Sequence, residues 1–107
     1  MYITMNRFRI KKGREAEFEE IWRTRESYLH EAPGFVAFHF LRGPEGEYIS
    51  HTLWESKEAF EGWVGSESFH KAHARAGQTP KDLFEGPAKL SFYDVLLSQG
   101  RERDSNG

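Results

Sequence analysis

The sequence contains no cysteine among its 107 residues. This absence excludes a disulfide framework, a thiolate metal site and a cysteine nucleophile. The chain also has no excess of basic residues, because 15 Lys and Arg stand against 17 Asp and Glu and give a net charge of −2. We therefore expect no nucleic acid and no anionic membrane as its partner.

Long apolar segments are missing as well. No stretch approaches the ~18 apolar residues of a membrane-spanning helix. The first residues, MYITMNRFRIKKG, lack the apolar core and the small-residue cleavage site of a signal peptide. We expect a protein without membrane segments, and a reducing cytoplasm is compatible with the lack of cysteine.

Aromatic residues, in contrast, are abundant and make up 15% of the chain, with nine Phe and three Trp. The length suits one small domain, which we place at residues 1–98, followed by a polar tail at residues 99–107 that we expect to be disordered. The large apolar content of so short a chain indicates burial beyond the core of one monomer.

Alternation and aromatic or β-branched residues predict four strands, at residues 2–10, 35–43, 47–54 and 88–97. The link GPEG at residues 43–46 favours a hairpin between the second and third strands. In the first strand, Asn6 shares one face with Phe8 and Ile10. In the second, both faces carry apolar side chains.

Helical spacing of apolar residues predicts the remaining elements. One amphipathic helix begins at Arg14, carries Trp22, Arg25 and Leu29 on its apolar side, and ends at the EAPG segment of residues 31–34. Ser56 is typical of an N-cap for a second helix that contains Trp63. After an interruption at Gly65 and Ser66, a third, short helix carries Phe69, Ala72, His73 and Ala76 on one stripe.

This order of elements predicts an α+β protein of the ferredoxin-like, split βαβ type. Its antiparallel sheet has helices on one face only. Because the other face is too apolar for water, we expect it to pack against a second copy, giving a homodimer of the dimeric α+β barrel kind.

Histidines on the third helix are the first candidates for chemistry. His73 lies on its apolar stripe, where it is either a buried, hydrogen-bonded core residue or a ligand and acid–base group. Small neighbours such as Ala72 would let a flat molecule approach it. His70 lies three residues earlier and can share part of that face. Too few His and carboxylate residues cluster with them to predict a zinc site.

Three further side chains allow both a structural and a functional interpretation. Trp63 is either core or a rigid wall against a planar ligand. Asn6, a poor strand former, is either a satisfied buried amide or a donor to a ligand. Arg25 either extends its head to water or clamps a carboxylate. We find no phosphate-binding glycine loop, no nucleophile elbow and no paired carboxylates on a common face.

Taken together, these residues resemble a known family. The segments NRFRIKKG, PGFVAFHFLRG and LWESKEAFEGW, with a histidine ten residues after the last tryptophan, are similar to the antibiotic-biosynthesis-monooxygenase superfamily. Within it, the combination of Asn6, Trp63 and His73 resembles the IsdG-type haem-degrading monooxygenases. The resemblance covers about residues 2–97.

The resemblance implies a site and an activity. His73 would be the axial ligand of haem iron, Asn6 would hydrogen-bond to oxygen species at the iron, and Trp63 would push the porphyrin out of plane. Trp22 would belong to the aromatic pocket, and Arg25 would approach a propionate. Haem would be both substrate and cofactor, O2 the oxidant, and a reductase or another external donor the electron source. The products would be an open-chain tetrapyrrole and free iron, whereas no role for His70 is implied.

Two alternatives remain open on the sequence. One is a cofactor-free monooxygenase of the same superfamily that oxidises a phenolic or quinol substrate; such an enzyme needs no axial histidine. The other is a haem-binding protein without turnover.

Overall fold

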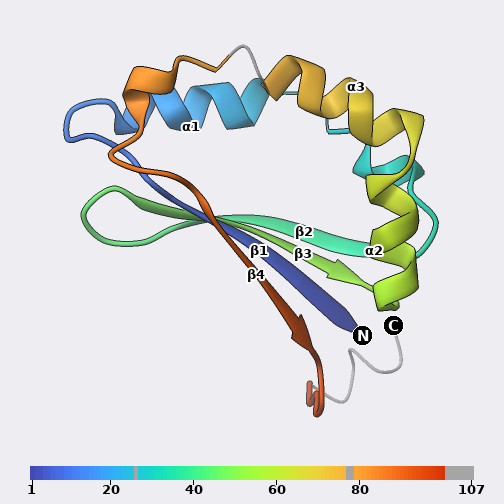
Figure 1. The fold of residues 1–107 in the computed structure, drawn as a ribbon. Helices are drawn as coiled ribbons and strands as arrows, with labels where there is room; N and C mark the ends of the chain where they lie inside the picture. Colours follow the sequence, from blue (N-terminus) through green and yellow to red (C-terminus); the bar gives the residue numbers. More distant parts are fainter. Residues whose placement is uncertain (26, 77–78, 101–107) are drawn as a thin grey trace.

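The computed structural model describes residues 1–25, 27–76 and 79–100 and shows a four-stranded sheet with helices on one side (Figure 1). The strands are β1 (Tyr2–Arg9), β2 (Phe35–Arg42), β3 (Glu47–Trp54) and β4 (Lys89–Asp94). They lie in the order β2-β3-β1-β4, and each neighbouring pair is antiparallel. This is the predicted ferredoxin-like topology.

Three α-helices cover one face of this sheet: α1 (Glu15–Thr24), α2 (Lys57–Val64) and α3 (Glu67–Ala76). Two short 3₁₀ turns, Leu29–Glu31 and Lys81–Leu83, complete the layer. Within the described residues, no helix is both long and apolar enough to cross a bilayer.

Serine side chains mark the start of α2 and the junction between α2 and α3. As predicted, Ser56 caps α2, since its Oγ accepts a hydrogen bond from the Ala59 N–H at 3.1 Å. Ser66 closes one helix and opens the next: its hydroxyl donates to the Trp63 carbonyl at 2.7 Å and accepts from the Phe69 N–H at 3.1 Å. This junction sets α2 against α3 and fixes how Trp63 lies relative to the third helix.

The β2–β3 hairpin forms where GPEG predicted it. Gly46 has φ +80°, a conformation that glycine adopts without cost. A Cβ at this position would lie 2.5 Å from the Ile10 carbonyl oxygen, so the tight approach of the hairpin to β1 depends on glycine.

The first helix is shorter than the sequence predicted. It ends at Thr24, whose hydroxyl bonds back to the Glu20 carbonyl at 2.9 Å, and Arg25 is already extended, with ψ 146°. Tyr28 then adopts the left-handed region at φ 61° before the 3₁₀ turn begins. Apolar residues continue at helical spacing past Thr24 because Leu29 is also buried in the core. Leu29 lies in the 3₁₀ turn, however, and not in a longer α1.

The last strand is also shorter than predicted. It ends at Asp94, which pairs with Tyr2, the first residue of β1. The Val95 N–H still donates to the Met1 carbonyl at 2.9 Å, but the partner strand has no residue left to pair with Leu96 and Leu97. These two side chains are 93% and 80% exposed. Residues 101–107 of the predicted tail lie outside the described residues, and the boundary at residue 98 stays a prediction.

Two aromatic clusters form the core between sheet and helices. The first contains Phe8, Ile10, Phe18, Tyr48 and Leu83, and the second contains Tyr2, Leu29, Trp54 and Trp63. The strands β1 and β3 contribute buried residues to these clusters, whereas the opposite face of the sheet carries no helix (Figure 1). On that uncovered face, Leu41 and Tyr93 are 41% and 50% exposed.

Candidate functional site

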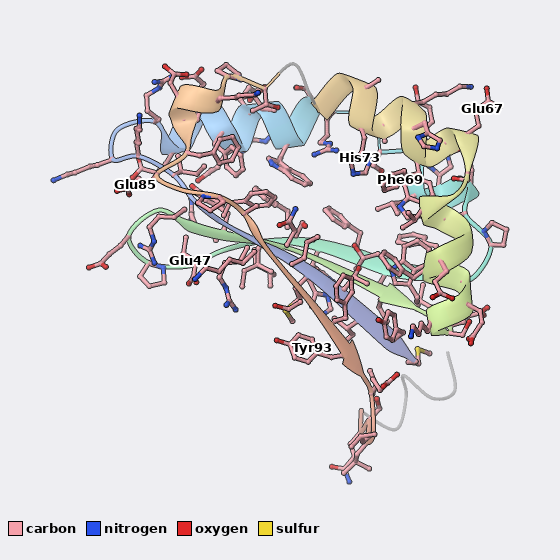
Figure 2. The ribbon with its side chains drawn as sticks, in the orientation of Figure 1. Glu47, Glu67, Phe69, His73, Glu85 and Tyr93 are labelled. Carbon is pink, nitrogen blue, oxygen red and sulfur yellow. The ribbon has the colours of Figure 1, made fainter. Side chains whose placement is uncertain are left out.

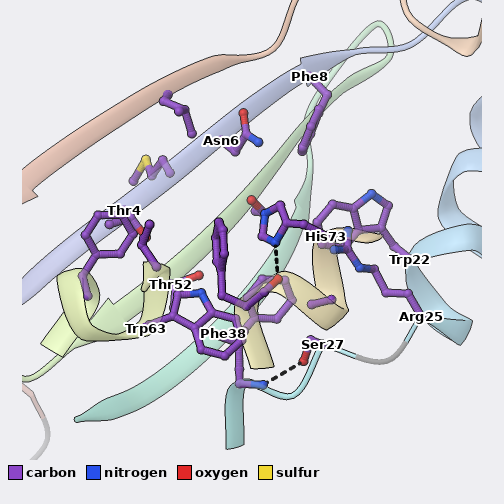
Figure 3. A pocket seen from close by; sticks show the side chains of 18 of the residues that line it. Thr4, Asn6, Phe8, Trp22, Arg25, Ser27, Phe38, Thr52, Trp63 and His73 are labelled. Carbon is purple, nitrogen blue, oxygen red and sulfur yellow. Dashed lines mark hydrogen bonds between the residues drawn. The ribbon is translucent and has the colours of Figure 1, made fainter. Parts of the chain in front are cut away.

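A cavity of about 680 Å³ lies between the sheet and the helices and borders both core clusters. Its walls carry many Phe and Trp side chains, and its lining comes from the sheet, from α1 to α3 and from the loops that join them. Figure 3 shows the cavity with the sheet on one side and the helices on the other. A volume of this size, lined by aromatic rings together with polar groups, is typical of a ligand-binding site.

Polar side chains from the two central strands form a patch on the sheet side of the cavity. Thr4 is paired in register with Thr52, and Asn6 with Ser50, and all four line the cavity. One of them, Thr4, accepts a hydrogen bond from Trp54 Nε1 at 3.3 Å. Thr4, Ser50 and Thr52 were not predicted as site residues, although polar side chains at every second position of a strand are the signal that could have identified them.

Asn6 is the most unusual member of this patch. It is half-buried, and its Oδ1 atom is shielded from solvent without a hydrogen-bond partner among the described residues. A buried amide oxygen without a partner costs free energy. The amide is therefore not the fully satisfied core group of the first interpretation, and the role of Asn6 as a donor to a ligand stays a prediction.

His73 lines the cavity from α3 (Figure 3). Its Nδ1 lies 2.9 Å from the carbonyl oxygen of Phe69, one turn earlier, and its ring centroid lies 3.8 Å from that of Phe69. Because a carbonyl oxygen only accepts, Nδ1 must carry the proton in this bond. The neutral ring then has its lone pair on Nε2, which is the arrangement found in ligating histidines oriented by a backbone carbonyl.

Trp63 is both core and cavity wall. Its side chain is 7% exposed, and its ring lies 6.2 Å from Trp54 and 5.8 Å from Phe69, perpendicular to the latter at 88°. The same residue lines the cavity. Because rigid aromatic rings pack against it on two sides, the Trp63 side chain has little room to move when a planar molecule enters the cavity.

Trp22 and Arg25 enclose the cavity from the end of α1. Trp22 stacks on Phe40 with centroids 4.7 Å apart and an angle of 11°. The guanidinium carbon of Arg25 lies 4.1 Å from the centre of the Trp22 ring. Burial lowers the pKa of Arg25, and no carboxylate of the described residues offsets that cost. A half-buried cation on an aromatic face, without such a counter-charge, is a favourable site for a ligand carboxylate.

The predicted site residues therefore meet in one place. Asn6, Trp22, Arg25, Trp63 and His73 all line the cavity, although they come from four separate elements or their ends. Buried Ala72 lines it too. The side chain of Ala76, the other small residue of that stripe, lies outside the described part.

His70 does not line this cavity. It is exposed on α3, with its ring 5.7 Å from Phe69. Among the described residues, no group of three or more His, Cys, Asp or Glu could hold a metal ion. Two further lining residues, Ser27 and Lys81, were not predicted from the sequence.

Comparisons with known proteins show which family the chain is similar to. A family model described as "Antibiotic biosynthesis monooxygenase" matches residues 1–75. The chain is 31% identical over 100 residues to a heme oxygenase (mycobilin-producing) of Mycobacterium tuberculosis, covering 92% of this chain and 91% of that protein. It is 29% identical over 101 residues to a heme-degrading monooxygenase of Bacillus cereus, covering 91% and 92%.

A solved structure is similar as well. The M. tuberculosis heme degrader MhuD, with two hemes bound in its active site, superimposes with a TM-score of 0.73 at 29% identity. The match covers 94% of this chain and all of that one.

Proposed function

This chain belongs to the antibiotic biosynthesis monooxygenase family, and from that membership and its cavity we propose that it is a haem-degrading monooxygenase. Relatives that align with more than nine-tenths of this chain are named heme oxygenase or heme-degrading monooxygenase, which supports haem degradation among the activities of the family. The observation that carries the proposal is His73: its Nδ1 is committed to the Phe69 carbonyl, so Nε2 is the atom left to bind iron beside an aromatic cavity.

The residues present fit haem. The cavity offers aromatic walls for the macrocycle, an imidazole for the iron, and for a propionate a guanidinium that has no carboxylate partner among the described residues. The buried Oδ1 of Asn6 lacks a partner in the described residues, as expected of a side chain that completes its contacts with a bound molecule. When bound, haem would be both the substrate and the centre at which O2 is activated.

Each side chain then has a stated task. His73 holds the iron through Nε2. Arg25, stacked on Trp22, pairs with a carboxylate of the substrate and sets its orientation. Trp63, fixed between Trp54 and Phe69, presses on one face of the ring and distorts it. Asn6 presents its amide N–H at the place where negative charge develops, and the aromatic walls exclude water from that place.

The wider reaction is part of the proposal. We propose that the products are an open-chain tetrapyrrole and free iron, and that electrons come from a reductase or another external donor. We also propose that two copies associate through the sheet faces that carry no helix. A cytoplasmic location stays a prediction.

A titration of the purified protein with haemin tests the proposal. We expect a shift of the Soret band on binding, and loss of that band when ascorbate is added in air. His73→Ala should lose the shift or bind haem far more weakly. His70→Ala, which changes a histidine of the same helix that does not line the cavity, should bind as the parent does.

The outcomes separate the competing functions. Binding without loss of the band under reductant would leave a haem-binding protein without turnover. Equal effects of the two histidine variants would mean that the iron ligand is wrongly assigned. Absence of any Soret shift would favour the cofactor-free oxygenase.

A further inference from the structure

The polar patch on the sheet side of the cavity lies between two pairs of aromatic residues. On one side of it, Tyr2 of β1 is opposite Trp54 of β3, and on the other, Phe8 is opposite Tyr48. All four rings are buried. The positions between them on the same face hold the patch itself: Thr4, Asn6, Ser50 and Thr52. Valine or isoleucine would suit central strand positions better, so the fold alone does not account for four polar residues there.

The hydroxyls of this patch are available to a molecule in the cavity. Thr52 is only 8% exposed, Ser50 is half-buried, and both line the cavity. Neither hydroxyl has a hydrogen-bond partner among the described residues. Because buried hydroxyls are normally hydrogen-bonded, a molecule bound in the cavity would supply the partners that the described part of the chain does not.

Asn6 by itself offers only part of a hydrogen-bonding site. Its Oδ1 is shielded from solvent, which leaves only the amide N–H groups for a molecule in the cavity. A hydroxyl, in contrast, can donate and accept at once and rotates to suit its partner. Ser50, opposite Asn6 in register, and Thr52, two residues further along β3, therefore add acceptors to the donors of Asn6. Such a set suits a small molecule that both gives and receives hydrogen bonds.

We propose that Asn6, Ser50 and Thr52 bind a small hydrogen-bonding ligand, which is water in the haem-free protein. An ordered water needs about two to four polar partners, and these side chains provide them. Figure 2 shows His73 on the side of α3 that faces the sheet, and Figure 3 shows Asn6 and Thr52 on the sheet side of the cavity. A haem held by His73 therefore turns its other face towards the patch.

The same hydroxyls then act on a ligand of the bound haem. A small anion held by the iron on the sheet side receives a hydrogen bond from Thr52 in addition to that from Asn6. Thr52 is thus a positioning residue beside Asn6. This part of the proposal rests on the proposed haem function, whereas the water site does not.

A high-resolution crystal structure of the haem-free full chain tests the water site. We expect an ordered water within hydrogen-bond distance of the Asn6 amide and of the hydroxyl of Ser50 or Thr52. Thr52→Val should lose or displace this water, and the variant should fold, because valine is a good strand former with the same branched shape. Ser91→Ala, which removes a hydroxyl from a β4 residue that does not line the cavity, should keep it. A parent structure without water at the patch would overturn the proposal.

Fluoride binding to the ferric haem complex tests the second part. Thr52→Val should weaken fluoride at least about tenfold, as expected for the loss of one hydrogen bond to an anion, while the Soret shift on haem binding stays as in the parent. Ser91→Ala should bind fluoride as the parent does. Equal fluoride affinity in the parent and in folded Thr52→Val would overturn the role of Thr52 at the haem. Absence of a Soret shift in the parent would instead contradict the proposed function and with it this second part, and the haem-free structure would still decide the water site.

Discussion

At the scale of single residues, Asn6 and Trp63 should separate haem binding from turnover. Neither is expected to bond to iron, so Asn6→Ala and Trp63→Phe should keep the Soret shift. Loss of one donor at a site of developing charge costs about 100-fold in rate. We therefore expect Asn6→Ala to degrade haem ~100-fold more slowly with ascorbate in air. Trp63→Phe should also be slower, because a smaller ring distorts the porphyrin less.

Phe rather than Ala is placed at position 63 so that the variant keeps the folded state. Trp63 is 7% exposed and packs against Trp54 and Phe69. Truncating it to Ala would cost roughly 3–5 kcal/mol and could unfold the chain. Each variant must keep a cooperative thermal transition before its rate is compared. Parental rates in both folded variants would show that these side chains serve the core alone.

Arg25 should contribute to haem affinity by pairing with a carboxylate of the haem. It stacks on Trp22 and lacks a carboxylate partner among the described residues. Arg25→Leu should therefore weaken binding of haem about tenfold, as expected for a lost charge-assisted hydrogen bond of ~1.5 kcal/mol. Haem dimethyl ester, which has no free carboxylate, should bind the parent and Arg25→Leu with similar affinity. If the variant weakened both ligands equally, Arg25 would act through packing against Trp22 rather than through charge.

At the scale of elements, a hydrogen bond joins α1 to β3. The hydroxyl of Tyr48 donates to Oε2 of Glu19. Burial, followed by this bond, raises the pKa of Tyr48 to about 12, and the same bond, followed by Arg42, lowers the pKa of Glu19. The neutral hydroxyl and the ionised carboxylate are thus the favoured forms in the folded protein.

This bond predicts a stability change at alkaline pH. The folded-state pKa of Tyr48 is above its unfolded value of about 10, so its contribution is complete below pH ~10 and is lost as the pH rises towards 12. Denaturant unfolding should show Tyr48→Phe less stable than the parent at pH 8, with the difference shrinking between pH 10 and 12. Tyr93→Phe, at an exposed position, is the control. A difference that stays constant over this range would contradict the role of the hydroxyl.

Sequence patterns predicted the elements well, because each depends mainly on local chemistry. Alternation gave all four strands, and Ser56 marked the start of α2 as observed. The ends of α1 and β4 were wrong because they depend on distant partners. Apolar spacing could not distinguish a helix through Leu29 from a 3₁₀ turn that buries the same residue, and β4 ends where β1 runs out.

For the site, too, single residues could be identified from the sequence, whereas their arrangement in space could not. Asn6, Trp63 and His73 were each ambiguous on their own chemistry, and only their combination resembled a known family. The cavity then brought them together with Trp22 and Arg25. The pairing of Asn6 with Ser50 could not be predicted, because it depends on the register between two strands that are distant in the chain. The extended backbone at Arg25 likewise follows from the early end of α1.

At the scale of the whole molecule, the uncovered sheet face sets the expected assembly. Helices lie on one face only, and the face opposite presents Leu41 and Tyr93 with 41% and 50% of their surfaces exposed. Half-buried Ile49 stands beside Leu41 in register on that face. Apolar sheet surfaces of this kind are unfavourable in water and are usually covered in stable assemblies.

We therefore expect a homodimer that forms through this face and persists at micromolar concentration in sedimentation experiments. Placing charges on the face should break it, because an unpaired ammonium group cannot be buried against a second apolar sheet at tolerable cost. The double substitution Leu41→Lys and Tyr93→Lys should give monomers that keep a cooperative thermal transition. Ala16→Lys adds a lysine to an exposed position of α1, on the opposite layer, and should remain dimeric. A parent chain that sediments as a monomer, or a double variant that remains a dimer, would show that the apolar sheet face is not what joins two copies.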